Sequence, residues 1–309
     1  MSMATAEAAV AIPRQPSAAA RPSAGLWSKA LARLRRDRLT LAASVVLLGL
    51  VALAAAADVL DAALFHYGPT RQDLLNTYAR PDLAHPAFWF GGDELGRSQI
   101  VRLLYGARVS LAVGFAGAFI NLSLGVSLGL LTGYFRGWLD DVVQFVITTF
   151  HSIPSLFLLL IVSVLFSPGP SQLVLIIGLL FWPNIALFVR GQSLSLRERE
   201  FVAAGRVIGA SHARLMFRHL LPNVLPLVLV LSAIDVGGIV LYESALSFLG
   251  LGILPPTPSW GNMLSNAASN LTRGPWLVHA PGAAIFLTVL CLYLIGDGLR
   301  DALDPRLGV

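Results

Sequence analysis

Long runs of apolar residues, separated by shorter polar stretches, make up most of this chain. A helix that crosses a lipid bilayer needs about 20 mostly apolar residues. Stretches of roughly this length occur at Leu39–Ala57, Ala107–Thr132, Val142–Phe166, Leu173–Val189, Pro222–Leu241 and Leu277–Ile295. The pattern therefore predicts an all-α membrane protein with six transmembrane helices.

The composition agrees with a chain built for lipid. Of the 309 residues, 56% are hydrophobic and only 13% are charged, and the mean hydropathy is +0.72. Soluble domains contain about 25% charged residues. The net charge of +5 comes almost wholly from arginine, because Lys29 is the only lysine. Membrane proteins place such residues on the cytoplasmic side, so we expect a lipid environment and no nucleic acid.

The distribution of basic residues predicts the orientation. Sixteen of the 22 Arg and Lys residues lie before residue 39, in the turn 133–141, in the loop 190–221 or after residue 298. The other six lie in the segments on the opposite side. Cytoplasmic segments carry the excess of Arg and Lys. Both termini and the loop 190–221 are therefore expected in the cytoplasm.

These spans divide the chain into parts. We expect a cytoplasmic tail (1–38) that is disordered to about residue 24 and basic after it, an uncleaved anchor (39–57), an external segment (58–106), a transmembrane core (107–298) and a C-terminal tail (299–309). The anchor is longer than the apolar part of a signal peptide, which has about 7–15 residues. Ile100, Leu103, Leu104 and Ala107 have helical spacing. They predict an amphipathic helix in the outer interface that turns into the second span.

The loop 190–221 is more structured than a simple connection between two spans. Residues at the i, i+3, i+4, i+7 spacing of one helix face are Phe201, Ala204, Gly205 and Ile208. Gly209 can take the positive φ that ends a helix. Ser211 is a good N-cap for a second helix, and Pro222 suits the start of the next span. The loop therefore predicts a helix, an elbow and a second helix on the membrane surface, which is the shape of a docking element.

The ordered residues of this loop resemble the EAA loop of ABC-importer permeases, the short cytoplasmic helix that sits in a groove of the ATPase subunit. The matching positions are Glu200, Ala203, Ala204, Gly209, Leu221 and Pro222. The resemblance implies that Glu200, Ala203, Ala204 and Gly209 couple the ATPase to the spans. An interfacial amphipathic helix without a partner is the alternative.

A wider resemblance covers residues 91 to 307. It rests on GGDELGRSQIVRLLYGARVSLAVG, HSIPSLFLLL, ESALSFLGLGILPPTPSWGNML and GDGLRDALDPRL. These blocks resemble the C-type permease subunit of dipeptide, oligopeptide and nickel ABC importers. Two departures are Ser98, where the family usually has Asp, and Asp235, where it usually has an apolar residue.

That resemblance implies the permease fold of type I ABC importers, in the inner membrane, and half of a path for short peptides. The implied partners are a second permease, two ATP-binding cassette subunits and an external solute-binding protein. Nickel, metal chelates or glutathione are alternative substrates. No cofactor is expected, because the phosphate-binding pattern GxxxxGK[ST] needs a glycine before its lysine and Ser28 precedes Lys29. ATP hydrolysis, and with it any enzyme activity, is expected on separate subunits, and the six histidines suggest no metal site.

Other classes of protein fit the sequence less well. Gly125, Ser127 and Gly129 match the G-x-S-x-G pattern of a nucleophile elbow, but that pattern needs a strand–turn–helix context. An intramembrane serine protease with His151 as the base is the enzyme alternative. We instead expect Gly125, Gly129 and Gly133 to form a ridge for close helix packing. A stand-alone channel or secondary carrier also fits an apolar chain of this kind, although carriers commonly show inverted repeats.

Two carboxylates lie on the fifth span, eight residues apart and thus on about the same helix face: Asp235 and Glu243. A charge at mid-bilayer costs about 2.5–3.5 kcal/mol on insertion scales and usually faces the bundle interior or a water-filled path. Both are candidates for the lining of the translocation path. A structural hydrogen bond is the alternative for each, equally supported for Asp235 and favoured for Glu243.

Overall fold

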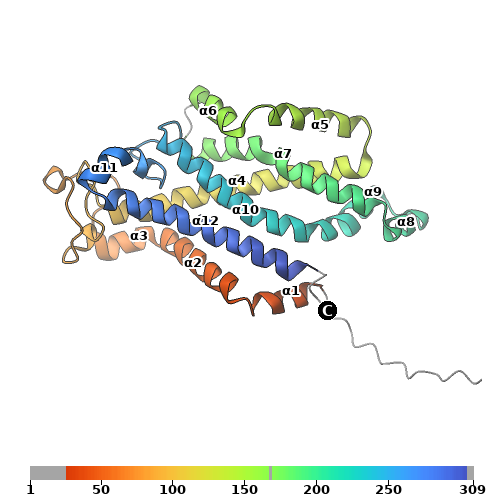
Figure 1. Cartoon of the computed structure of the whole chain (residues 1–309), viewed down its shortest axis with the longest axis horizontal. Helices are drawn as coiled ribbons and strands as arrows, with labels where there is room; N and C mark the ends of the chain where they lie inside the picture. Colours follow the sequence, from red (N-terminus) through yellow and green to blue (C-terminus); the bar gives the residue numbers. More distant parts are fainter. Residues whose placement is uncertain (1–25, 167–168, 305–309) are drawn as a thin grey trace, which may run out of the picture.

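The computed structural model describes residues 26–166 and 169–304, and these residues form helices and no strand (Figure 1). The predicted disordered tail lies outside the described residues, as do residues 305–309. The helices are α1 Leu26–Leu34, α2 Arg38–Ala55, α3 Ala57–Leu60, α4 Gln99–Phe135, α5 Trp138–His151, α6 Ser155–Phe166, α7 Pro170–Arg197, α8 Glu200–Val207, α9 His212–Arg214, α10 Leu221–Phe248, α11 Ala267–Arg273 and α12 Trp276–Leu303. Two π-helical segments (61–65 and 215–220) and three short 3₁₀ turns (74–76, 86–88 and 262–264) complete the secondary structure.

Among the residues that the structure describes, five helical stretches are long and apolar enough to cross a membrane: α2, α4, α7, the run His212–Phe248 and α12. The bent pair α5 and α6 makes a sixth if it is counted as one span. The predicted span Val142–Phe166 is therefore not one straight helix, because the chain bends by 86° between its two halves. Pro154 lies in the break, where its ring disfavours a helical residue before it. Pro183, by contrast, lies inside an unbroken α7.

The second span also differs from the expectation. α4 is one continuous helix of 37 residues, so the predicted turn from an interfacial helix into the span is not there. The reason is that the first turns of α4 pack against the loop between α10 and α11: the Trp260 indole donates to the Leu103 carbonyl at 3.1 Å, and the Trp260 backbone N–H donates to Ser110 Oγ at 3.2 Å. α4 therefore continues beyond the apolar stretch under a cover of protein.

The end of the molecule at which α4 begins is a folded cap with a buried ion-pair network. Asp93 Oδ2 lies 2.6 Å from Arg97 Nε and 3.5 Å from Arg102 Nε, and all three side chains are buried. Ser98 is the N-cap of α4 and accepts from the Val101 N–H at 3.3 Å. A serine at this position therefore caps the helix.

The glycine ridge of α4 packs closely on α7. A Cβ added at Gly125 would lie 2.6 Å from Ile185, one at Gly129 would lie 2.7 Å from a backbone carbonyl of α7, and one at Gly133 would lie 2.6 Å from Ser193. This contact confirms the predicted packing role of the three glycines. Ser127 lies inside the same continuous helix, which is not the geometry of a nucleophile elbow.

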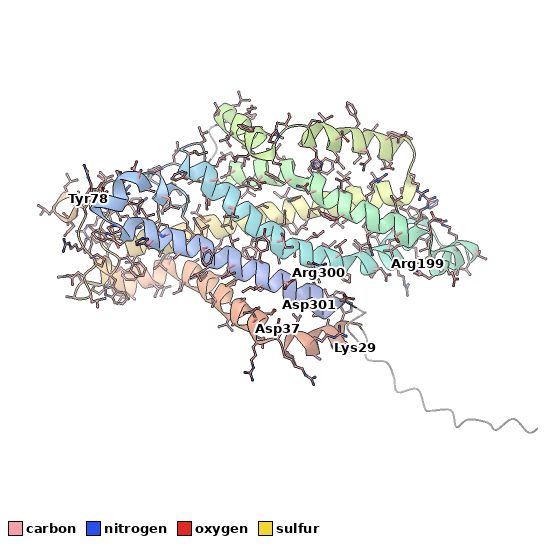
Figure 2. The ribbon with its side chains drawn as sticks, in the orientation of Figure 1. Lys29, Asp37, Tyr78, Arg199, Arg300 and Asp301 are labelled. Carbon is pink, nitrogen blue, oxygen red and sulfur yellow. The ribbon has the colours of Figure 1, made fainter. Side chains whose placement is uncertain are left out.

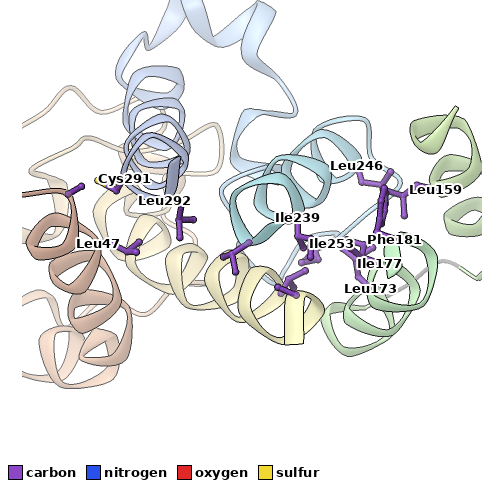
Figure 3. Close-up of a cluster of buried hydrophobic side chains, with 14 residues drawn as sticks. Leu47, Leu159, Leu173, Ile177, Phe181, Ile239, Leu246, Ile253, Cys291 and Leu292 are labelled. Atoms are coloured by element: carbon purple, nitrogen blue, oxygen red, sulfur yellow. The ribbon is translucent and has the colours of Figure 1, made fainter. Parts of the chain in front are cut away.

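The hydrophobic core lies where α4, α7, α10 and α12 meet (Figure 3). Its buried side chains include Ile177 and Phe181 from α7, Ile239 and Leu246 from α10, and the single cysteine, Cys291, from α12. This core fixes α10, which carries both predicted membrane carboxylates, against α4.

Candidate coupling loop and membrane carboxylates

The loop after α7 forms a short protruding helix and a reversal. α8 begins at Glu200, Gly209 has a φ of +76°, and Ser211 Oγ accepts from the Arg214 N–H at 3.3 Å as the N-cap of α9. The predicted helix, elbow and N-cap are therefore confirmed. α8 lies toward the same end of the bundle as α1 and the C-terminal end of α12 (Figure 1).

Polar side chains show the same division of the molecule into two ends. Figure 2 shows Arg199, Lys29 and Arg300 toward one end and Tyr78 at the other. The loop helix thus lies on the side that carries most of the basic residues.

The second helix of the loop is not a separate surface helix. α9 continues through the π-helical segment 215–220 into α10, so one helical run extends from His212 to Phe248. Pro222 lies in the first turn of α10, as expected, although α10 is itself part of this longer run. Local π-helical adjustments can satisfy the backbone groups that a proline leaves free, and here the π segment directly precedes α10.

The structure places Glu200, Ala203 and Ala204 on the exposed surface of α8, and Gly209 at the exposed elbow. The inward residues of α8 are Val202 and Gly205. A Cβ added at Gly205 would lie 2.8 Å from Leu215 Cδ2.

The predicted helix face is therefore only partly an internal one. Gly205 points into the protein, whereas Phe201 and Ile208 are 41% and 84% exposed. Val207 is 87% exposed beside them. Exposed apolar patches with a polar rim are typical of protein–protein contact sites, and the patch on α8 has the exposed side chains of Arg199 and Arg206 around it.

Specific contacts connect the loop to the spans. Tyr134, near the end of α4, is buried, and its hydroxyl lies 2.8 Å from His212 Nδ1. Arg206 of α8 lies over the same Tyr134 ring at 5.9 Å. Val202 and Leu215 belong to a buried cluster shared with α4, α7 and α10. A displacement of α8 therefore acts directly on three spans.

The two carboxylates of α10 both face α4. Glu243 is fully buried and accepts from Ser110 Oγ and Ser247 Oγ, each at 2.8 Å. Asp235 is half-buried and accepts from Asn121 Nδ2 at 2.9 and 2.8 Å. Their placement confirms the prediction that both lie on about one face of the helix. A role of either in a translocation path stays a prediction.

Comparison with known proteins shows the family. The profile of the binding-protein-dependent transport system inner membrane component matches residues 125–309. This chain belongs to that family. The oligopeptide transport system permease protein OppC of Haemophilus influenzae is 37% identical to this chain over 281 residues. The match covers 91% of this chain and 89% of OppC. OppC of Bacillus subtilis is 34% identical over 92% of this chain and 91% of its own length.

Two further comparisons describe this inner membrane component. The glutathione transport system permease protein GsiD of Pectobacterium atrosepticum is 36% identical over 91% of each chain. A solved structure of the MetNI methionine ABC transporter in inward-facing conformations is similar with a TM-score of 0.50 and 21% identity, covering 66% of this chain and 96% of that one. The fold is that of an ABC importer permease.

One ion pair of this chain has no signal in its sequence. Arg190 holds Asp140 through a paired contact, with Nε–Oδ1 at 2.6 Å and Nη2–Oδ2 at 2.7 Å. This contact clamps the start of α5 to the end of α7 near the loop. A charged pair within the same turn or helix follows a local spacing rule, but these two residues are 50 positions apart, so no local pattern marks them.

Proposed function

We propose that this chain is the transmembrane permease subunit of an ATP-driven importer and forms half of a path for short peptides. The observation that carries the proposal is the protruding α8. Its EAA-type residues Glu200, Ala203 and Ala204 are exposed, and so is the apolar patch on the same helix. The substrate class is taken from the relatives, which are named as oligopeptide and dipeptide permeases.

The partners follow from the loop. Its exposed apolar side chains need a cover, and the arginines around them favour an acidic rim on that cover. One permease supplies one docking loop, whereas an ABC importer works with two ATPase subunits. A second permease therefore pairs with this chain, and an external solute-binding protein delivers the substrate. ATP is bound and hydrolysed on the partner subunits.

In the proposed orientation the chain lies in the inner membrane, with α8 and both termini on the cytoplasmic side. The basis is the excess of Arg and Lys on that side of the spans. Within this arrangement Glu200, Ala203, Ala204 and Gly209 transmit ATPase movement and do not bind substrate. On α10, Asp235 and Glu243 are the candidate polar residues of the path, with a structural hydrogen bond as the favoured role for Glu243.

The test is purification of the tagged full-length chain in mild detergent, followed by uptake assays in proteoliposomes. We expect a second permease and two ATPase subunits to copurify, and the complex with its binding protein to move di- and oligopeptides only when ATP is supplied. An active, ATP-independent monomer would contradict the proposal and favour a channel or secondary carrier.

Glutathione is the second candidate substrate, because a glutathione permease is 36% identical over nine-tenths of the chain. Nickel or a metal chelate is a third candidate, which rests on the resemblance to nickel importers alone. The same proteoliposomes distinguish these substrates when each is offered alone. Uptake of glutathione or of a metal chelate with no uptake of any peptide would reassign the substrate and leave the role as a permease intact.

A further inference from the structure

The carboxylate of Asp235 lies in a span without a cation beside it. None of the ion pairs between the residues that the structure describes includes Asp235. Its hydrogen-bond partner is Asn121 Nδ2, which lies 2.9 and 2.8 Å from its two oxygens. An amide nitrogen that donates to both oxygens suits an ionised carboxylate. Ionised groups inside membranes are normally paired, and Asp235 has no countercharge among the described side chains.

The amide beside this carboxylate is also incompletely satisfied. Asn121 is fully buried in α4, and its Oδ1 has no hydrogen-bond partner among the described residues. A buried polar atom without a partner costs free energy and needs an explanation. Two neighbouring acceptor groups are thus the Asp235 carboxylate and the Asn121 amide oxygen. Among the described residues, their one side-chain donor is the Asn121 amide nitrogen, which donates to the carboxylate.

The second carboxylate of α10 provides a contrast. Glu243 accepts hydrogen bonds from Ser110 and Ser247, and it has no exposed surface. Its oxygens are satisfied by the protein, so nothing in its surroundings calls for a ligand.

A large groove follows the half of α10 that precedes Asp235. The groove has a volume of about 1040 Å³ and is lined by α7, α10, α12 and Trp27 of α1. On α10 it runs from Pro222 to Ile234. Leu231 lies one helical turn before Asp235, on the same side of α10, and Ile234 directly precedes it. The lining of the groove therefore stops one residue short of the carboxylate, which is about halfway along α10.

We propose that Asp235 and Asn121 form a recognition site for the protonated amino group of the transported peptide. The inference rests on the peptide substrate proposed above. An ammonium group has three donors and one positive charge, so it supplies a countercharge for Asp235 and a donor for Asn121 Oδ1. A charge-assisted hydrogen bond of this kind is stronger than a neutral one.

The experiment uses the complete transporter, with its partner subunits and one binding protein, in proteoliposomes. Each neutral peptide of two to five residues is compared with its analogue that carries a hydroxyl in place of the amino group. We expect wild type to move the amino form about tenfold or more faster, and Asp235→Asn to bring the two rates within about threefold of each other. Because the binding protein is the same, a change in this ratio reports on the permease.

Two further variants separate recognition from structure. Asn121→Leu removes the amide acceptor and should reduce the ratio in the same direction. Ser232→Ala removes another polar group of α10, whose hydroxyl bonds only to the Leu229 carbonyl among the described residues, and should leave the ratio unchanged. Each rate is divided by the amount of assembled complex.

The outcomes distinguish the two proposals. If wild type moves peptides and Asp235→Asn keeps the wild-type ratio, or slows both forms equally, Asp235 is a structural residue and the inference is overturned. If wild type moves neither form of any peptide, the proposed peptide transport itself fails.

Discussion

At the scale of single residues, Gly209 shows why the elbow of the loop needs glycine. Its φ is +76°, yet nothing lies within 4 Å of a Cβ added at this position. The requirement is therefore one of backbone conformation and not of space. Side chains with a Cβ pay a penalty of about 1–2 kcal/mol in this left-handed region, and only Asn and Asp visit it with some regularity.

Gly209→Val should therefore disturb the elbow without disturbing the bundle. We expect the variant chain to insert in the membrane in normal amounts, to lose hold of the ATPase subunits and to lose transport, because α8 is turned away from its docking orientation. The measurement is the amount of ATPase that copurifies with each variant, together with peptide uptake.

Gly209→Asn is the matched control, since asparagine tolerates the left-handed region and should retain most of the ATPase. Normal uptake and normal ATPase recovery with valine at this position would show that the loop is only a connector between spans.

The sequence predicted the residues of the loop well because capping and turn formation are local. Glu200 starts α8 and Ser211 caps α9 through contacts within four positions along the chain. The site around Asp235 was only half predictable. Its carboxylate stands out in an apolar span, but Asn121 lies 114 residues away, and only the packing of α4 on α10 brings the two together.

At the scale of elements, the contact between α4 and α7 depends on small residues. Gly129 lies so close to α7 that an added Cβ would lie 2.7 Å from the Ala186 carbonyl and 2.7 Å from Val189 Cβ. A backbone atom cannot swing away as a flexible side chain can, so a larger residue must push the two helices apart.

Gly129→Leu should therefore lower the melting temperature of the purified chain in detergent and reduce its yield. Gly49→Leu is the matched control: this glycine lies within α2, and nothing lies within 4 Å of an added Cβ, so we expect no loss. Equal melting temperatures for the two variants would show that the α4–α7 contact yields easily and does not hold the bundle together.

The apolar pattern located the spans but not the full extent of the helices. α4 and the run from His212 to Phe248 both continue beyond their apolar stretches. Polar residues can extend a spanning helix wherever protein covers them, and hydropathy alone does not report that cover. The bend between α5 and α6 was likewise visible only as Pro154, which marks a break but gives no angle.

At the scale of the whole molecule, α4 connects the two ends. It begins under the folded cap and ends beside the loop between α7 and α10, where Tyr134 contacts His212. Near its N-terminal end, the Tyr105 hydroxyl donates to Asp58 at 2.7 Å, and this hydrogen bond lowers the pKa of the Asp58 carboxyl. The same helix thus carries two tyrosine hydrogen bonds, one at each side of the membrane core.

These two tyrosines allow a test of how movement of α8 reaches the spans. If the hydrogen bond between Tyr134 and His212 transmits that movement, Tyr134→Phe should keep the ATPase subunits bound and ATP hydrolysis intact, but reduce the number of peptides imported per ATP hydrolysed. A hydrogen bond contributes about 0.5–1.5 kcal/mol, so a loss of coupling of about twofold to tenfold is expected.

Tyr105→Phe makes the same chemical change on the same helix at the opposite end, away from the loop, and should leave the ratio of import to hydrolysis at the wild-type value. The measurement is parallel uptake and phosphate release in proteoliposomes. An unchanged ratio for Tyr134→Phe, or an equal reduction for both variants, would place the transmission elsewhere, most directly in the apolar contact of Val202 and Gly205 with Leu215.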